Sequence, residues 1–347
     1  MFDTIAAPNE VFVSFDLAKE AINKREYEDI IFNPQTASIT KSTFKIADKE
    51  YPMYDVFLDA VFSLTGLPRK NEKILPTENV VQDLCTLIEL AYNTDEKLCL
   101  RLLDGNAYTL FKLTHKDTVR QPLDHKRFIN ALENNIDLSL IKRIVLTPKF
   151  MRVTTLEDDE NNNLLADDGY FVGKDYVNGE LFKGFTLTVG LTLRRKLTNG
   201  EASAPCGQKY SQLRMSDTPN KMAQKFAEMC TNIEPDLELA KFRLNRLTEI
   251  PMTIPLLKFI STSMNFATQD VKDKLFGGYY EVDDDGKLTK DIRASSLKDI
   301  TLYEFYSEIC RLAPEVDEVI RYRMEFFAGS LLNENNKKVL DALAMTA

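Results

Sequence analysis

The clearest hydrophobic pattern in the chain lies near its middle. From residue 185 to residue 193 every second residue is apolar, and threonine or glycine stands between them, with arginine next in the row. Successive side chains of a β-strand point to opposite faces, so this alternation predicts a strand with one buried face and one solvent-exposed face. Strand-like segments at 170–177 and 180–198 end at Asn178-Gly179 and Asn199-Gly200, and Asn-Gly is a strong hairpin signal. This region predicts an antiparallel meander with one solvated, basic face.

The residues ahead of the meander mix strand-like and helix-like patterns. Apolar residues three and four apart predict helices at 80–92 and 126–134. Two apolar runs, 98–103 and 107–113, flank Asp104-Gly105-Asn106, which predicts a hairpin because Asp-Gly tolerates positive φ. Shorter patterns predict a strand at 11–15, a helix at 17–27 capped by Asp16, and an extended segment at 144–156.

Helical patterns follow the meander to the end of the chain. Helices are predicted at 219–233, 235–247 and 255–267. Thr301 and Glu304 have the spacing of a capping box, which predicts a helix to Leu312, and Pro314 predicts the start of the next, to about Leu332. The expected fold class is α+β, an antiparallel meander followed by C-terminal helices, with a mixed α/β N-terminal part. The expected parts are residues 1–156 and 169–347, or else one continuous domain.

Composition places the chain among folded globular proteins, because 44% of its residues are hydrophobic and only 28% are charged. No apolar run approaches the roughly 20 residues that a membrane span needs. The first residues lack the basic and apolar segments of a secretory signal. The five cysteines are odd in number and scattered, which is typical of reduced, mostly buried thiols. The sequence therefore predicts a cytoplasmic protein without a membrane partner.

The chain carries no familiar catalytic or metal-binding pattern. His115 and His125 have no metal-binding spacing and are expected in loops or at the surface, no cysteine pair has zinc-site spacing, and phosphate-binding loops are absent. The acidic run 157–163 fails the spacing of a calcium loop, because the sixth and twelfth positions counted from Asp158 hold Asn163 and Gly169. It is expected to be a solvated loop, and residues 283–286 a hairpin turn. We therefore expect no metal, no cofactor and no catalytic residue; an enzyme with an unfamiliar carboxylate site remains a further alternative.

Charge is distributed unevenly along the chain. Residues 169–225 contain nine Lys and Arg against four acids, a net charge of +5, whereas the whole chain carries −9, so the remainder carries −14. We call residues 169–225 the basic belt. Cations neutralise phosphates, and an aromatic ring stacks on a base, so the belt predicts a nucleic-acid interface. The alternative is that these cations pair with acidic groups of the chain or of a partner subunit. The candidate binding residues are Lys183, Arg194, Arg195, Lys196, Lys209, Tyr210 and Arg214.

Two passages carry a resemblance to a known family. The segment 194–200, Arg-Arg-Lys-Leu-Thr-Asn-Gly, resembles the Arg-x-x-Cys-x-Asn-Gly element of a phage- and plasmid-encoded family of unknown function, with Leu197 in place of the cysteine. The segments 301–308 and 325–332 are similar to that family's closing helices, so the resemblance spans about residues 170–332. The family's organisation is similar to that of phage single-strand annealing proteins, a likeness of fold alone.

Together these observations lead to two hypotheses of different class. The first is a non-catalytic protein of phage or plasmid type that binds single-stranded DNA through the basic belt, as a homo-oligomer or larger assembly in the host cytoplasm. The second is a virion structural, assembly or anti-defence component, in which the belt contacts an acidic surface of a partner protein.

Overall fold

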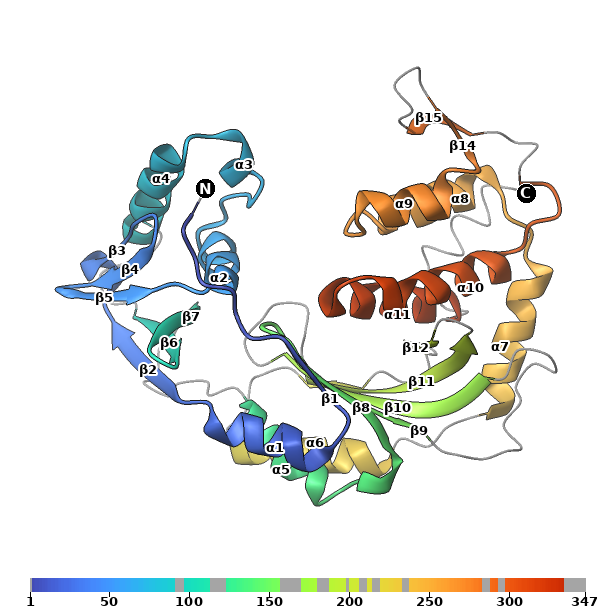
Figure 1. Cartoon of the computed structure of the whole chain (residues 1–347), viewed down its shortest axis with the longest axis horizontal. Helices are drawn as coiled ribbons and strands as arrows, with labels where there is room; N and C mark the ends of the chain where they lie inside the picture. The colour runs from blue at the N-terminus through green and yellow to red at the C-terminus, as the bar shows by residue number, and fades with distance from the viewer. Residues whose placement is uncertain are drawn as a thin grey trace.

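The computed structural model has the α+β architecture expected from the sequence (Figure 1). It describes residues 2–90, 97–112, 123–156, 170–179, 187–197, 200–205, 211–213, 219–232, 237–282, 288–292 and 297–333. Across these residues no helix combines the length and the apolar character that crossing a membrane requires.

A seven-stranded antiparallel sheet forms the centre of the molecule. Its strand order is β1-β8-β9-β10-β11-β12, and β13 pairs with β11 beside β12. The strands are β1 (Glu10–Phe12), β8 (Ile141–Leu146), β9 (Met151–Leu156), β10 (Tyr170–Asn178), β11 (Leu187–Leu197), β12 (Gly200–Pro205) and β13 (Ser211–Leu213). The predicted meander is confirmed, and the segment expected to be extended at 144–156 is a pair of strands. The interval between residues 156 and 169 lies between the paired strands β9 and β10, so the two expected parts share one sheet.

Residues 27–112 form a lobe with its own apolar core, here called the N-terminal lobe. It contains two three-stranded sheets, ordered β2-β6-β7 and β3-β4-β5. The predicted hairpin at Asp104-Gly105 is confirmed, and both residues have positive φ, 50° and 79°. The strands are β2 (Tyr27–Phe32), β3 (Ala37–Ile39), β4 (Thr43–Ile46), β5 (Lys49–Pro52), β6 (Leu98–Leu103) and β7 (Asn106–Lys112), and the helices are α2 (Asp55–Thr65), α3 (Asn71–Ile74), α4 (Thr77–Leu90) and the 3-10 turn η1 (Pro34–Thr36).

Helices cover both faces of the large sheet. On one face lie α1 (Phe15–Lys24), α5 (His125–Glu133) and α6 (Pro219–Asn232), and on the other lie α10 (Leu302–Leu312) and α11 (Glu318–Leu331) (Figure 1). Beside these two pack α7 (Leu237–Glu249), α8 (Ile254–Ser263), α9 (Gln269–Phe276), the hairpin β14 (Tyr280–Val282) and β15 (Leu288–Ile292), and the 3-10 turn η4 (Ala313–Glu315); η2 (Leu138–Leu140) precedes β8. One large hydrophobic core joins these helices to the sheet.

A cluster of aromatic and aliphatic side chains joins the N-terminal lobe to the large sheet and to α11. We call it the aromatic seam; its buried members are Tyr54, Val56, Leu103, Tyr108, Phe150, Val177 and Tyr322. The rings of Phe150 and Tyr322 lie 5.1 Å apart, and the Tyr108 hydroxyl donates a hydrogen bond of 2.6 Å to the Pro148 carbonyl. The lobe is therefore packed against the large sheet and its covering helices, which we call the body, and is not merely tethered to them.

Capping residues decide where several helices begin. The predicted capping box of Thr301 and Glu304 is confirmed at the start of α10. The predicted start of the next helix at Pro314 is wrong, because Pro314 lies in a 3-10 turn and Asp317 caps α11 by accepting from the amides of Val319 and Ile320. Asp16 is not the cap of α1, which begins at Phe15 after Ser14.

Candidate functional site

The described part of the basic belt comprises β10, β11, β12 and β13, at one side of the large sheet, and the first half of α6. Arg195 and Lys196 belong to β11, where they pair with Ala202 and Glu201 of β12. Lys183, Lys209, Tyr210 and Arg214 lie outside the described residues, as do the side chains of Arg195 and Lys196. The belt is therefore located in the structure through the backbone pairing of its strands and not through its side chains.

That register brings the ends of the undescribed segments to the same edge. β10 occupies one side of β11, so β12 and β13 both lie on the other side. Ser211, which follows Tyr210 in sequence, pairs with Val189, and Leu213, which precedes Arg214, pairs with Leu187. From Leu187 to Lys196 the strand extends about 30 Å at its usual rise per residue. The pairing therefore places Ser211–Leu213 beside the start of β11, whereas Arg195 and Lys196 lie near its end.

The expectation that the polar face of β11 is solvated is wrong. Thr188, Thr192 and Arg194 are all buried, with Arg194 only 6% exposed. These side chains lie on the sheet face that carries Asp175 and Arg152, and α11 covers that face. Arg194 is therefore a buried residue under α11 and not part of an exposed binding surface.

Arg194 borders a buried group of charges between the sheet and α11, which we call the ionic cluster. Arg152 of β9 donates to the carboxylates of Asp175 and Glu325, and Arg321 donates to Glu325 at 3.0 Å. Thr154 also donates to Asp175, at 2.6 Å. The side chains of Arg152, Asp175 and Glu325 are at most 4% exposed. Removing such charges from water is costly, and only close pairing of this kind offsets the cost.

The cluster keeps its carboxylate ionised. Burial by itself raises the pKa of the Glu325 carboxyl, but the guanidinium groups of Arg152 and Arg321 outweigh burial and hold that pKa below its ordinary range. Burial lowers the pKa of the Arg194 guanidinium, while the negative charge of Asp175 opposes that shift. A carboxylate held in this way is a poor general acid or base, because it does not exchange its proton near neutral pH. The ionic cluster therefore serves to position α11.

Histidines and cysteines form no reactive group among the described residues. His125 is 1% exposed at the start of α5, near Asn178, so the expectation of a loop or surface position is wrong for it; His115 lies outside the described residues. Cys99, Cys230 and Cys310 are buried, and burial raises the pKa of the Cys99 and Cys230 thiols to about 12. Within the described ranges no three His, Cys, Asp or Glu side chains are grouped to hold a metal ion. The acidic runs 157–163 and 283–286 lie outside those ranges, although β14 and β15 on either side of the second run pair as predicted.

No protein-family model matches the chain, and no curated protein or solved structure is significantly similar to it. The likeness of segment 194–200 to a phage- and plasmid-encoded element thus remains a resemblance of short motifs. The structure adds that this segment includes the end of β11 and the β11–β12 connection.

Sequence reasoning did not find the ionic cluster. Its members come from β9, β10 and α11, separated by up to 173 positions. The sequence signal for it is the run of threonine and arginine on the polar face of β11, a pattern that fits a solvated face equally well. A buried polar face needs a polar partner, and Arg321 and Glu325 are spaced four residues apart on one side of a helix.

Proposed function

We propose that the protein is a non-catalytic binding protein of phage or plasmid type, acting in the cytoplasm as a homo-oligomer or larger assembly. In this proposal single-stranded nucleic acid binds along the edge of the large sheet formed by β11, β12 and β13. The observation that supports it is the strand register. β12 pairs with the end of β11 that holds Arg195 and Lys196, and β13, which lies between Tyr210 and Arg214 in sequence, pairs with the start of β11 about 30 Å away.

The chemistry of this edge suits a flexible polyanion. Neutralisation of phosphates by Lys and Arg releases counterions and makes binding steeply dependent on salt. Bases stack on aromatic rings with little regard to sequence, which is the role proposed for Tyr210. A binding surface of this length matches the range of about 4–16 nucleotides that single-strand-binding modules cover. Arg194 has no part in this contact because it lies under α11.

The proposal is tested by fluorescence anisotropy with a labelled oligothymidylate of about 30 nucleotides, at low and at moderate salt. The double variant Arg195→Ala/Lys196→Ala should weaken binding at least about tenfold. The matched control is Lys70→Ala/Lys73→Ala, which removes the same charge from exposed positions of the N-terminal lobe, outside the basic belt. The control should bind nearly as the parent protein does.

Each alternative has its own result. If micromolar protein gives no anisotropy change even at low salt, the nucleic-acid proposal is wrong. If both double variants lose affinity equally, overall charge and not the sheet edge governs binding. Light scattering distinguishes the virion or assembly hypothesis from the nucleic-acid proposal. The virion or assembly hypothesis predicts that Arg195→Ala/Lys196→Ala changes the mass of the assembled particle. It also predicts that the purified protein shows no nucleic-acid absorbance.

A further inference from the structure

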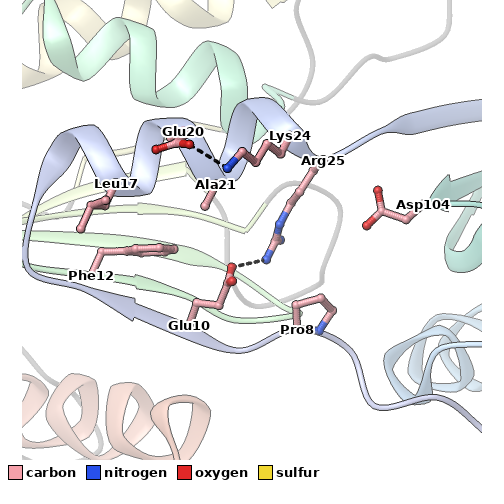
Figure 2. A pocket seen from close by; sticks show the side chains of 9 residues that line it. All are labelled: Pro8, Glu10, Phe12, Leu17, Glu20, Ala21, Lys24, Arg25 and Asp104. Atoms are coloured by element: carbon pink, nitrogen blue, oxygen red, sulfur yellow. Dashed lines mark hydrogen bonds and ion pairs between the residues drawn. The ribbon is translucent and has the colours of Figure 1, made fainter.

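A hollow of about 490 Å³ lies at the opposite edge of the large sheet, between β1, α1 and the β6–β7 turn (Figure 2). Pockets for small molecules begin at roughly 300 Å³. Its lining combines apolar and charged side chains: Pro8, Glu10, Phe12, Leu17, Glu20, Ala21, Lys24, Arg25 and Asp104. None of these residues belongs to the basic belt or to the ionic cluster.

Arg25 is the most buried charged group of this hollow. It is 6% exposed, and its Nη2 donates to Oε2 of Glu10 at 3.0 Å. Its Nε and Nη1 donate to no group in the described ranges of the chain. A guanidinium carries five N–H donors in a planar fork that suits a carboxylate. Arg25 therefore offers the hollow a buried, directional site for an anionic group.

Asp104 and an apolar wall lie on opposite sides of Arg25. Figure 2 shows Asp104 on one side, and Phe12, Leu17 and Ala21 on the other. Oδ1 of Asp104 accepts from the Glu26 backbone N–H at 3.0 Å, while Oδ2 accepts from no donor among the described residues. A cationic group next to Asp104 and an apolar group against Phe12 and Leu17 would both be accommodated.

We propose that this hollow binds a free α-amino acid with an apolar side chain. Its carboxylate accepts from Nη1 of Arg25, its ammonium group pairs with Asp104, and its side chain covers Phe12 and Leu17. A simple anion is disfavoured because three carboxylates and two cations line the hollow. Glu10 accepts from Nη2 of Arg25 only, so a simple amine leaves Nε and Nη1 without an acceptor in the hollow, whereas a zwitterion supplies both a carboxylate for Arg25 and a cation for Asp104.

Isothermal titration of the full chain with L-leucine tests the site, and three analogues each remove one contact. N-acetyl-L-leucine lacks the ammonium group, L-leucinamide lacks the carboxylate, and glycine lacks the side chain. We expect saturable binding of L-leucine and at least about tenfold weaker binding of each analogue. Each analogue loses either a hydrogen-bonded charge or an apolar side chain, and either loss is large enough for a tenfold change in affinity.

The variant Asp104→Asn separates the ammonium contact from folding. Asparagine tolerates the positive φ of this position and still accepts the Glu26 amide, so the hairpin should form. We expect it to weaken L-leucine at least about tenfold but to leave the weak binding of N-acetyl-L-leucine unchanged. Asp83→Asn, at an exposed position of α4, is the matched control and should bind L-leucine as the parent does.

Three results would each overturn the proposal, whatever the outcome with nucleic acid. They are absence of heat with millimolar L-leucine, equal binding of all analogues, and an unchanged affinity of Asp104→Asn for L-leucine.

Discussion

The ionic cluster shows how single residues fasten a helix to a sheet. Glu325 lies within reach of two guanidinium groups, and its side chain is fully buried. An apolar underside on α11 would pack well against an apolar sheet face, but here it would leave the buried Arg152 with one carboxylate, that of Asp175, in place of two. Once these sheet residues are charged, the residues of α11 opposite them have to be charged as well.

Replacing Glu325 by alanine tests this dependence. Glu325→Ala leaves Arg152 and Arg321 buried without their shared carboxylate, so the free energy of unfolding should fall by about 3–5 kcal/mol. The control Glu20→Ala removes a carboxylate that is 60% exposed and paired with Lys24, and should leave the free energy of unfolding nearly unchanged. Urea denaturation measures both; similar effects of the two changes would contradict a stabilising role for the cluster.

The same carboxylate predicts a dependence on pH. The pKa of Glu325 is lower in the folded protein than in the unfolded chain, where it is about 4.3. A depressed pKa stabilises the fold above the unfolded value, and this contribution is lost as the pH falls from there through the folded value. Glu325→Gln should therefore be less stable than the parent at neutral pH, and the difference in unfolding free energy should narrow only below about pH 4.3. A constant difference in acid, measured by urea denaturation at several pH values, would show that Glu325 is not the titrating group.

At the scale of elements, patterns read along the chain located most strands and helices. The alternation of β11 gave the buried face correctly, since Leu187, Val189, Leu191 and Leu193 are all buried. It failed for the opposite face, because period-two alternation distinguishes two faces by polarity but does not say whether a polar face meets water or a polar helix. The register that anchors the candidate edge was likewise beyond prediction, since β13 pairs with the start of β11 across two undescribed segments.

The capping box of α10 permits a test of one element. Thr301→Ala removes the side chain that caps the N3 amide, so the free energy of unfolding should fall by about 1 kcal/mol. Thr86→Ala makes the same chemical change at an exposed position inside α4, where alanine is the better helix former, and should be neutral or slightly stabilising. Denaturation curves of the two variants would contradict the capping argument if Thr86→Ala were the more destabilised.

At the scale of the whole molecule, the N-terminal lobe and the body have separate cores joined by the aromatic seam. Lys149 and Asp59 form an ion pair across the same junction, and Tyr54 donates its amide to Ala107 inside the lobe. Tyr322 is the contribution of α11, where its ring packs on Phe150 and lies 5.4 Å from the Arg152 guanidinium. Tyr322 therefore connects the lobe, the sheet and the ionic cluster.

This connection predicts that lobe and body unfold together and that loss of one ring separates them. The chain has no tryptophan, so the half-buried positions Phe111 of β7 and Phe266 after α8 can each carry one as a reporter of lobe and body. With Tyr322 present, Phe111→Trp and Phe266→Trp should show the same urea midpoint, as a cooperative unit requires. Adding Tyr322→Ala should destabilise the seam by about 3–5 kcal/mol and split the two midpoints, because each core keeps its own apolar contacts.

Two other results have distinct meanings. Separate midpoints already in the presence of Tyr322 would mean that the seam does not couple the two parts. Coincident midpoints after removal of the Tyr322 ring would place the coupling in the remaining seam residues.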